Sequence, residues 1–226
     1  MRSRTRARLP GIAARSMFAL MDARLMAWAR AVKARQRKTR RAADQRGRGG
    51  VPPLWLFTDQ ARLPDPLPAI AALPKGLAGV VLRPEGAADP RQLGRAVARL
   101  CRARRLMLVV AGQPGLAHEL RAGAHLRGGY GHRARHRCGI HATSSAHGMA
   151  EAIRARRAGA GLIFVSPVFA TRSHPGARAL GALRWARIVR CSVIPGAALG
   201  GISGITVRYL PPRFCHAVGA IGALAI

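Results

Sequence analysis

The sequence has few acidic residues, few lysines and few aromatic residues, and each shortage narrows the possible ligands or the composition of the core. Only 8 acidic residues stand against 39 basic ones, which gives a formal net charge of +31. Lysine occurs at positions 33, 38 and 75 alone, so arginine supplies nearly all of the positive charge. Such an excess favours anionic ligands such as nucleic acid, anionic membranes or phosphorylated small molecules. Arginine, alanine, glycine and proline all have GC-rich codons, however, and we attribute most of the charge of the globular part to this compositional bias.

Aromatic residues make up 4% of the chain and cysteines number four, while hydrophobic residues reach 49%. A core can therefore form from alanine, valine, leucine and isoleucine, which excludes wholesale disorder. The cysteines form no Cys-x-x-Cys pair and fit no disulfide framework. No apolar run is long enough to span a bilayer, and Asp22 and Arg24 interrupt the apolar residues near the N-terminus, so no secretory segment is expected. We expect a reduced, cytoplasmic protein.

The first 50 residues differ in character from the rest. They hold 15 basic residues and only two acids. Apolar residues recur at helical spacing over 17–32, and the basic run KARQRKTRR follows at 33–41. Three explanations stay open: a basic amphipathic helix for membrane or nucleic acid, a targeting peptide, or a poorly ordered extension. We expect an Arg-rich extension over 1–50, poorly ordered or partly helical, followed by a globular domain over 51–226.

Beyond Pro52, short apolar runs alternate with helical patterns. The strand candidates are LWLFTD (54–59), GVVLRP (79–84), LMLVVA (106–111), GAHLRG (123–128), GIHATS (139–144), GLIFVSP (161–167), PGAALGG (195–201) and AVGAIGAL (217–224). Most are unbroken apolar runs, which is typical of parallel strands buried on both faces. Clear helices lie between several of them, at 90–105 behind an Asp89 cap, at 148–159 and at 179–190. We predict an α/β fold, a small (β/α)8 TIM barrel with some helices short or missing, and an open doubly wound sheet is its rival.

Ligands of such barrels bind at the carboxyl ends of the strands, so the residues that follow each strand are candidates for a site. Arg83 and Arg127 follow the second and fourth strands, and the polar segment 144–147 follows the fifth. The polar loop 166–174 follows the sixth strand, and the glycine pair of ALGGISG follows the seventh. Glycines let backbone N–H groups approach an oxyanion closely, which favours a phosphate site there.

The segment SAHGMAEAIRARRAGAGLIFVSPVFATRSHPGARALG (145–181) resembles the signature of the thiamine phosphate synthase/TenI family. That signature has S-x-H, a helix ending in Gly-Ala, an apolar strand ending in Gly-Pro-Val-Phe, then T-x-S-[KH]-x-G and a Leu-Gly. ALGGI (198–202) is similar to the family's A-I-G-G-I, and GAIGAL (219–224) and LFTD (56–59) also fit. The resemblance covers about residues 54–224 and leaves the basic extension out.

The resemblance implies a (β/α)8 barrel and an enzyme of thiamine biosynthesis. Its synthases are transferases that condense a thiazole phosphate with a hydroxymethylpyrimidine diphosphate, with the help of magnesium. A related branch tautomerises the thiazole carboxylate phosphate without that condensation. We expect this chain to bind a phosphorylated thiazole and leave open whether it condenses or tautomerises. A non-catalytic phosphate-ligand binder is an alternative, as is nucleic-acid or membrane binding through 1–50, and a homo-oligomer is left open.

The resemblance also assigns roles to individual residues. The predicted site residues are His147 as catalytic acid or base, Arg83, Ser145, Thr171, Ser173 and His174 for substrate binding, and Gly200, Gly201 and Gly222 for phosphate binding. Histidine suits proton transfer because its reference pKa lies near neutrality. His174 stands where the synthases usually carry lysine. Of the family's Q-x-R-x-K on the second strand, only Arg83 is kept.

Metal binding is the main departure from the family. Its Asn-Asp pair after the third strand reads Ala111-Gly112 here, and the aspartate that follows H-L-G-Q on the fourth strand is lost in HLRGGYG. Magnesium prefers carboxylate oxygens, so its expected ligands are missing and no metal site is assigned. His132, His136, Cys138 and His141 have residue types that suit zinc, but three intervening arginines would repel a cation. Nucleic-acid binding by the basic run is not expected, because no aromatic residues interleave to stack bases.

Overall fold

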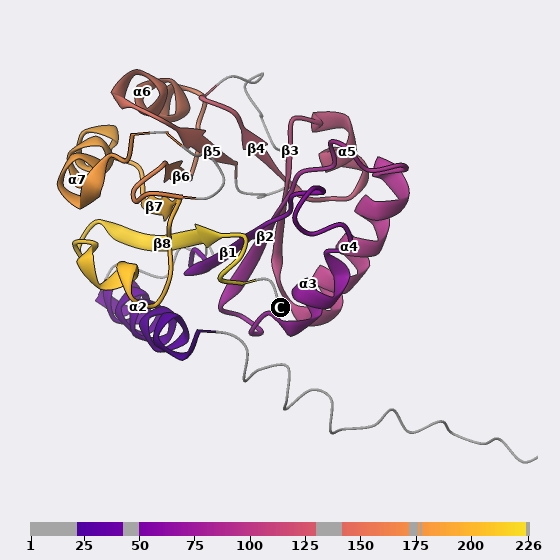
Figure 1. Ribbon diagram of the computed structural model, residues 1–226, viewed down its shortest axis with the longest axis horizontal. Coiled ribbons are helices and arrows are strands. Elements are labelled where there is room, and N and C mark those ends of the chain that lie inside the picture. Colours follow the sequence, from indigo (N-terminus) through magenta and orange to yellow (C-terminus); the bar gives the residue numbers. More distant parts are fainter. Residues whose placement is uncertain (1–21, 43–49, 130–141, 172–175, 177, 225–226) are drawn as a thin grey trace, which may run out of the picture.

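The computed structural model describes residues 22–42, 50–129, 142–171, 176 and 178–224 (Figure 1). Eight parallel strands close into a barrel, with β1 paired to β8, and most of the helices lie around its outside. The strands are β1 (Leu54–Phe57), β2 (Ala78–Leu82), β3 (Met107–Ala111), β4 (Gly123–Leu126), β5 (Thr143–Ala146), β6 (Leu162–Val165), β7 (Gly196–Leu199) and β8 (Cys215–Ala220). The predicted (β/α)8 barrel is confirmed, and the open sheet is excluded because a closed barrel has no edge strand.

The helices vary widely in length. They are α2 (Ala23–Ala42), α3 (Leu67–Ala72), α4 (Pro90–Arg104), α5 (Pro114–Glu119), α6 (Met149–Arg157), α7 (Gly181–Ser192) and the 3-10 helix η1 (Thr206–Tyr209). Asp89 caps α4 as predicted, because its carboxylate accepts hydrogen bonds from the backbone N–H groups of Arg91 and Gln92. With α3 and α5 at 6 residues each, the prediction of short helices is also confirmed. None of the helices in the described segments is long and apolar enough to cross a membrane.

Aromatic side chains fill the barrel interior. Trp55, Phe57 and Phe164 are fully buried there and meet edge to face, with ring centroids 5.6 Å apart for Trp55–Phe164 and 4.9 Å apart for Phe57–Phe164. Gly79 lies beside Trp55 on the neighbouring strand, and a Cβ there would come within 2.8 Å of the indole ring. Three of the chain's few aromatic residues thus supply bulk to the barrel interior, and Gly79 makes room for one of them.

The helix α2 packs on the outer wall of the barrel beside β8 (Figure 1). Its Leu25, Ala29 and Val32 are at most 1% exposed. Two polar contacts join the helix to the barrel: Asp22, just before its start, accepts a hydrogen bond from the Gly204 N–H at 2.5 Å, and Gln36 Nε2 donates to the His216 carbonyl at 3.1 Å. Within the segment expected to be poorly ordered or partly helical, residues 23–42 therefore form a helix that covers the wall near the short η1.

The fifth strand differs most from its predicted range. The sequence placed it at 139–144, whereas β5 runs from Thr143 to Ala146. Two serines occupy its centre, so the strand carries no apolar run that would mark it. Its side chains are nevertheless mostly buried, because both neighbours, β4 and β6, pair with it inside the closed barrel.

Candidate functional site

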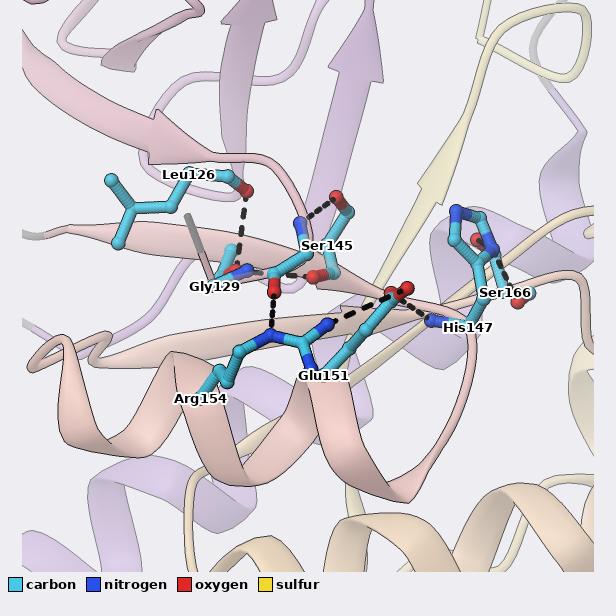
Figure 2. Close-up of polar contacts among 9 residues, drawn as sticks. Leu126, Gly129, Ser145, His147, Glu151, Arg154 and Ser166 are labelled. Carbon is cyan, nitrogen blue, oxygen red and sulfur yellow. Dashed lines mark hydrogen bonds and ion pairs between the residues drawn. The ribbon is translucent and has the colours of Figure 1, made fainter. Parts of the chain in front are cut away.

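His147 lies just beyond the carboxyl end of β5 and faces the end of β6 (Figure 2). Its Nδ1 lies 3.0 Å from the backbone carbonyl oxygen of Ser166. A carbonyl oxygen only accepts, so Nδ1 carries the hydrogen in this bond. In the neutral ring, Nε2 then keeps its lone pair. The imidazole is solvent-exposed and can reach a ligand at the mouth of the barrel.

The first turns of α6 hold the backbone of His147 in place. Glu151 Oε2 accepts a hydrogen bond from the His147 N–H at 2.8 Å, and Arg154 Nη2 lies 3.9 Å from the other carboxylate oxygen of Glu151. Arg154 Nε also donates to the Gly128 carbonyl at 3.1 Å, which ties the helix to the loop after β4 (Figure 2). Glu151 is the third residue after the Gly148 N-cap, where a glutamate commonly bonds backwards to the chain. That signal was present in the sequence, although Glu151 was not among the predicted site residues.

Ser145 holds the loop after β4 by a hydrogen bond from the Gly128 N–H to its Oγ, at 3.3 Å. Ser144 does the same for the Gly129 N–H at 3.2 Å and donates to the Leu126 carbonyl (Figure 2). Among the described residues, no acceptor bonds the hydroxyl hydrogen of Ser145. Ser145 therefore has an evident structural role, and its predicted contact with substrate stays a prediction.

Gly200 and Gly201 have backbone φ angles of +92° and +65°, which favour glycine. A Cβ on Gly200 would lie 2.9 Å from Pro167, and one on Gly201 would lie 2.4 Å from the Ala170 carbonyl oxygen. The loops after β6 and β7 are also joined by a hydrogen bond from the Phe169 N–H to the Gly200 carbonyl, at 3.1 Å. The packing of these two loops explains both glycines, and phosphate binding there remains a prediction.

Gly222, the third predicted phosphate-binding glycine, has different surroundings. It is exposed after β8, and a Cβ built on it would meet no described atom within 4 Å. Its φ lies outside the left-handed region, unlike those of the Gly200–Gly201 pair. Neither close packing nor backbone conformation requires glycine at this position, and phosphate binding by Gly222 remains a prediction.

Arg83 lies at the end of β2 with its guanidinium 5.0 Å from the centroid of the Phe57 ring. Its backbone N–H donates to Thr58 Oγ1 at 2.8 Å, which fixes the start of the side chain. Burial lowers the pKa of the Arg83 guanidinium, while the nearby Asp59 carboxylate acts in the opposite direction. An arginine keeps its charge despite such a shift, so Arg83 supplies a fixed, half-buried cation at the mouth.

Arg127 adds a second cation at the end of β4, where it forms an ion pair with Glu85 from the loop after β2. A Cβ on Gly112 would lie 2.9 Å from Glu85 Oε1 and 3.6 Å from Arg127 Cζ. This ion pair therefore fills the space in which a longer side chain at position 112 would stand. The sequence marked Arg127 only as a residue that follows a strand, and it did not reveal the ion pair, since a pairing over 42 positions of sequence leaves no local signal.

Magnesium does not fit the residues present at this mouth. Position 112, where the resemblance places a carboxylate, is glycine, and the Glu85 carboxylate beside it is already neutralised by Arg127. Over the part of the chain that the structure describes, no three His, Cys, Asp or Glu side chains gather as metal ligands. A hard divalent cation prefers several carboxylate oxygens, whereas the Asp59 and Glu85 carboxylates here lie near the guanidinium groups of Arg83 and Arg127.

His125 lies inside the barrel, directly below these arginines. It is 4% exposed, its Nδ1 lies 2.8 Å from Thr143 Oγ1, and its ring packs edge to face on Phe57. Burial, reinforced by the positive charges of Arg83 and Arg127, lowers the pKa of His125 to about 3. The ring is thus neutral at physiological pH and acts as a packing residue of the barrel interior.

The low pKa of His125 predicts acid sensitivity. Below its ordinary pKa of 6.5, the unfolded chain takes up a proton that the folded chain refuses until about pH 3, so stability falls as pH decreases through that window. Between about pH 7 and about pH 4.5, His125 should contribute a loss of about 2–3 kcal/mol. Urea denaturation at both pH values measures this loss. In His125→Leu, the unfolding free energy should fall between the two pH values by about 2–3 kcal/mol less than in the unmodified protein. An equally steep dependence in the variant would assign the acid sensitivity to other groups.

The remaining predicted residues lie on the loop after β6. Thr171 is half-buried there. Ser173 and His174 lie outside the described residues, as do His132, His136, Cys138 and His141, whose residue types suit zinc but for which no metal site was assigned. The structure thus brings His147 and the glycines after β7 and β8 to the same end of the barrel as Arg83, because all of them follow parallel strands.

Comparison with known proteins agrees with the fold. A family model described as thiamine monophosphate synthase matches residues 57–222. Thiamine phosphate pyrophosphorylase from Pyrococcus furiosus is similar in structure, with a TM-score of 0.64 and 22% identity, over 75% of this chain and 85% of that one. FabK from Thermotoga maritima has a TM-score of 0.56 and 18% identity, over 76% of this chain and 58% of that one. At these identities the structural likeness shows the barrel fold alone. No curated protein gives a significant sequence match.

Proposed function

The chain belongs to the thiamine monophosphate synthase family, and on this premise we propose that it binds a phosphorylated thiazole at the barrel mouth and moves a proton on it through His147. The single observation that carries the proposal is the hydrogen bond from His147 Nδ1–H to the Ser166 carbonyl oxygen. That bond holds the ring and leaves Nε2 as the proton-accepting atom. The product is a tautomer of the substrate, as in the tautomerase branch that the sequence resembles.

The proposed reaction balances within one substrate molecule. Nε2 removes a proton from one atom of the thiazole ring system, and the bonding electrons shift within the ring. The imidazolium that forms keeps its Nδ1–H bond to the Ser166 carbonyl, which stabilises the added charge. Nε2 then returns the proton to a second ring atom, so no group leaves and no electron acceptor is needed.

The phosphate group of the substrate is assigned to the loops after β7 and β8. Open space in front of Gly222 supports this assignment. Replacing Gly222 with valine should weaken the binding of thiazole phosphate by about tenfold or more, because the side chain enters that space. Titration calorimetry measures the effect, and the midpoint of thermal unfolding should stay within about 2 °C, since no packed atom is displaced.

A matched control is Gly161→Val at the opposite end of the barrel. Gly161 is also exposed, has no left-handed φ, and its nearest described neighbour to a new Cβ is the Ala142 carbonyl oxygen at 3.7 Å. Thiazole phosphate should bind this variant as it binds the unmodified chain. Equal affinities for the Gly222 and Gly161 variants would remove Gly222 from the site. Gly201→Asp is a poorer probe, because a side chain there disrupts loop packing with or without ligand.

Condensation of the thiazole phosphate with a pyrimidine diphosphate is the second candidate, and the description of the matching family favours it. The Arg127–Glu85 pair counts against it, since it occupies the place of a carboxylate needed for magnesium. Incubation with both substrates, with and without magnesium, separates the candidates. Magnesium-dependent formation of thiamine phosphate would establish condensation and displace the tautomerase proposal.

A further inference from the structure

A cavity of about 660 Å³ opens between α4 and α5, beside the first residues of β3 and β4. The amino ends of the strands lie at the opposite end of the barrel from the mouth, so this cavity is separate from the candidate site. Its apolar lining includes Leu106 and Leu120, and its charged lining includes Arg95, Arg99, Arg102 and Arg121. The volume lies within the range of small-molecule sites.

The charges around this cavity are unbalanced. Glu119 is the one acidic residue of the lining, and Arg95 Nη2 binds it at 2.7 Å. Arg102 donates to the Leu120 carbonyl at 3.4 Å. Neither Arg99 nor Arg121 has a carboxylate within ion-pair distance in the segments that the structure describes. The lining thus offers cationic groups without acidic partners above an apolar floor.

We propose that this cavity binds a small amphipathic anion, with a carboxylate, phosphate or sulfonate at the arginines and an apolar body against Leu106 and Leu120. Guanidinium groups bind planar or tetrahedral oxyanions through paired N–H donors. The apolar floor separates this ligand class from inorganic phosphate, which would gain nothing from burying hydrocarbon.

The backbone conformation of Arg121 allows its guanidinium to be removed without strain. Arg121 follows α5 with a φ of +51°, a left-handed conformation in which glycine is favoured over arginine. Arg121→Gly therefore removes the guanidinium without straining the chain. Arg105 follows α4 with a φ of +53° and is also exposed, but it does not line the cavity. Arg105→Gly is a matched control that removes the same charge from the same backbone conformation.

The probe is 1-anilinonaphthalene-8-sulfonate, an aromatic sulfonate whose fluorescence rises in apolar surroundings. Its affinity should fall by about fivefold in Arg121→Gly and by less than about twofold in Arg105→Gly. Adding Arg99→Ala to Arg121→Gly should weaken binding further. Thermal unfolding of all three variants checks that each is folded. Decanoate should displace the probe at concentrations at which inorganic phosphate does not.

Equal probe affinity in the Arg121 and Arg105 variants would overturn the proposal. So would displacement by phosphate as readily as by decanoate, since the apolar floor would then have no part in binding. Either failure leaves the proposed function untouched, because the two sites lie at opposite ends of the barrel.

Discussion

Replacing Leu25 and Val32 together by alanine should lower the free energy of unfolding by about 4–6 kcal/mol. Both side chains of α2 are 1% exposed, and their truncation leaves cavities against the wall of the barrel beside β8. Single domains are stable by only about 5–15 kcal/mol, so the double variant should be close to unfolded at ambient temperature. Urea denaturation followed by circular dichroism measures the change.

The control lies on the opposite side of the same helix. Arg30 is exposed, and Arg30→Ala should change the unfolding free energy by less than about 0.5 kcal/mol, as is usual for surface positions. If the double core variant were no less stable than the Arg30 variant, the packing of α2 would not contribute to the stability of the barrel.

This role of α2 also changes how polyanion binding by the first 50 residues must be tested. A chain that starts at Val51 lacks the helix and the apolar contacts it makes, so any loss of binding could come from unfolding. Charge variants of exposed residues, such as Arg30, Arg37 and Lys38 to glutamine, keep the packed face intact. Their binding to a nucleic acid or an anionic vesicle addresses the segment directly.

His147→Gln should lower kcat for thiazole tautomerisation by about 10²–10⁴-fold, the usual contribution of a general acid or base. Glutamine can still donate to the Ser166 carbonyl, but it cannot accept and return a proton at the position of Nε2. KM should change little, because the phosphate is assigned to other loops. Steady-state kinetics over a range of pH measure both parameters.

Glu151→Gln is the companion variant. Glu151 is a positioning residue that accepts a hydrogen bond from the His147 backbone N–H, and glutamine retains an acceptor oxygen. Its kcat should therefore fall by less than about tenfold. Full activity in the His147 variant would show that another group carries out the proton transfer. Equal losses of kcat in the His147 and Glu151 variants would indicate a structural effect.

The barrel was predictable from the sequence because parallel strands buried on both faces leave unbroken apolar runs, as in LMLVVA and GLIFVSP. The fifth strand was displaced in the prediction because Ser144 and Ser145 use their hydroxyls to hold the loop after β4, a role that hydropathy does not reveal. The packing of α2 against the barrel could not be predicted from the sequence either. Its periodicity predicts a helix, but the contact that fixes its start joins Asp22 to Gly204, 182 positions away.

Within the candidate site, the predicted glycines show how one residue type serves different purposes. Gly200 and Gly201 are required by the approach of the loop after β6, whereas Gly222 faces open space. A sequence cannot separate these cases, because both read as glycine after a strand. The Arg127–Glu85 pair is likewise invisible in sequence, and it is the contact that most changes the electrostatics expected of the mouth.

The most direct test of the central claim is the rate of thiazole carboxylate phosphate tautomerisation by the intact protein, with and without a metal chelator. Because the mouth offers His147 for proton transfer and arginines where magnesium ligands would be needed, we predict conversion at the same rate in both conditions. No conversion, or conversion that the chelator abolishes, would contradict the account.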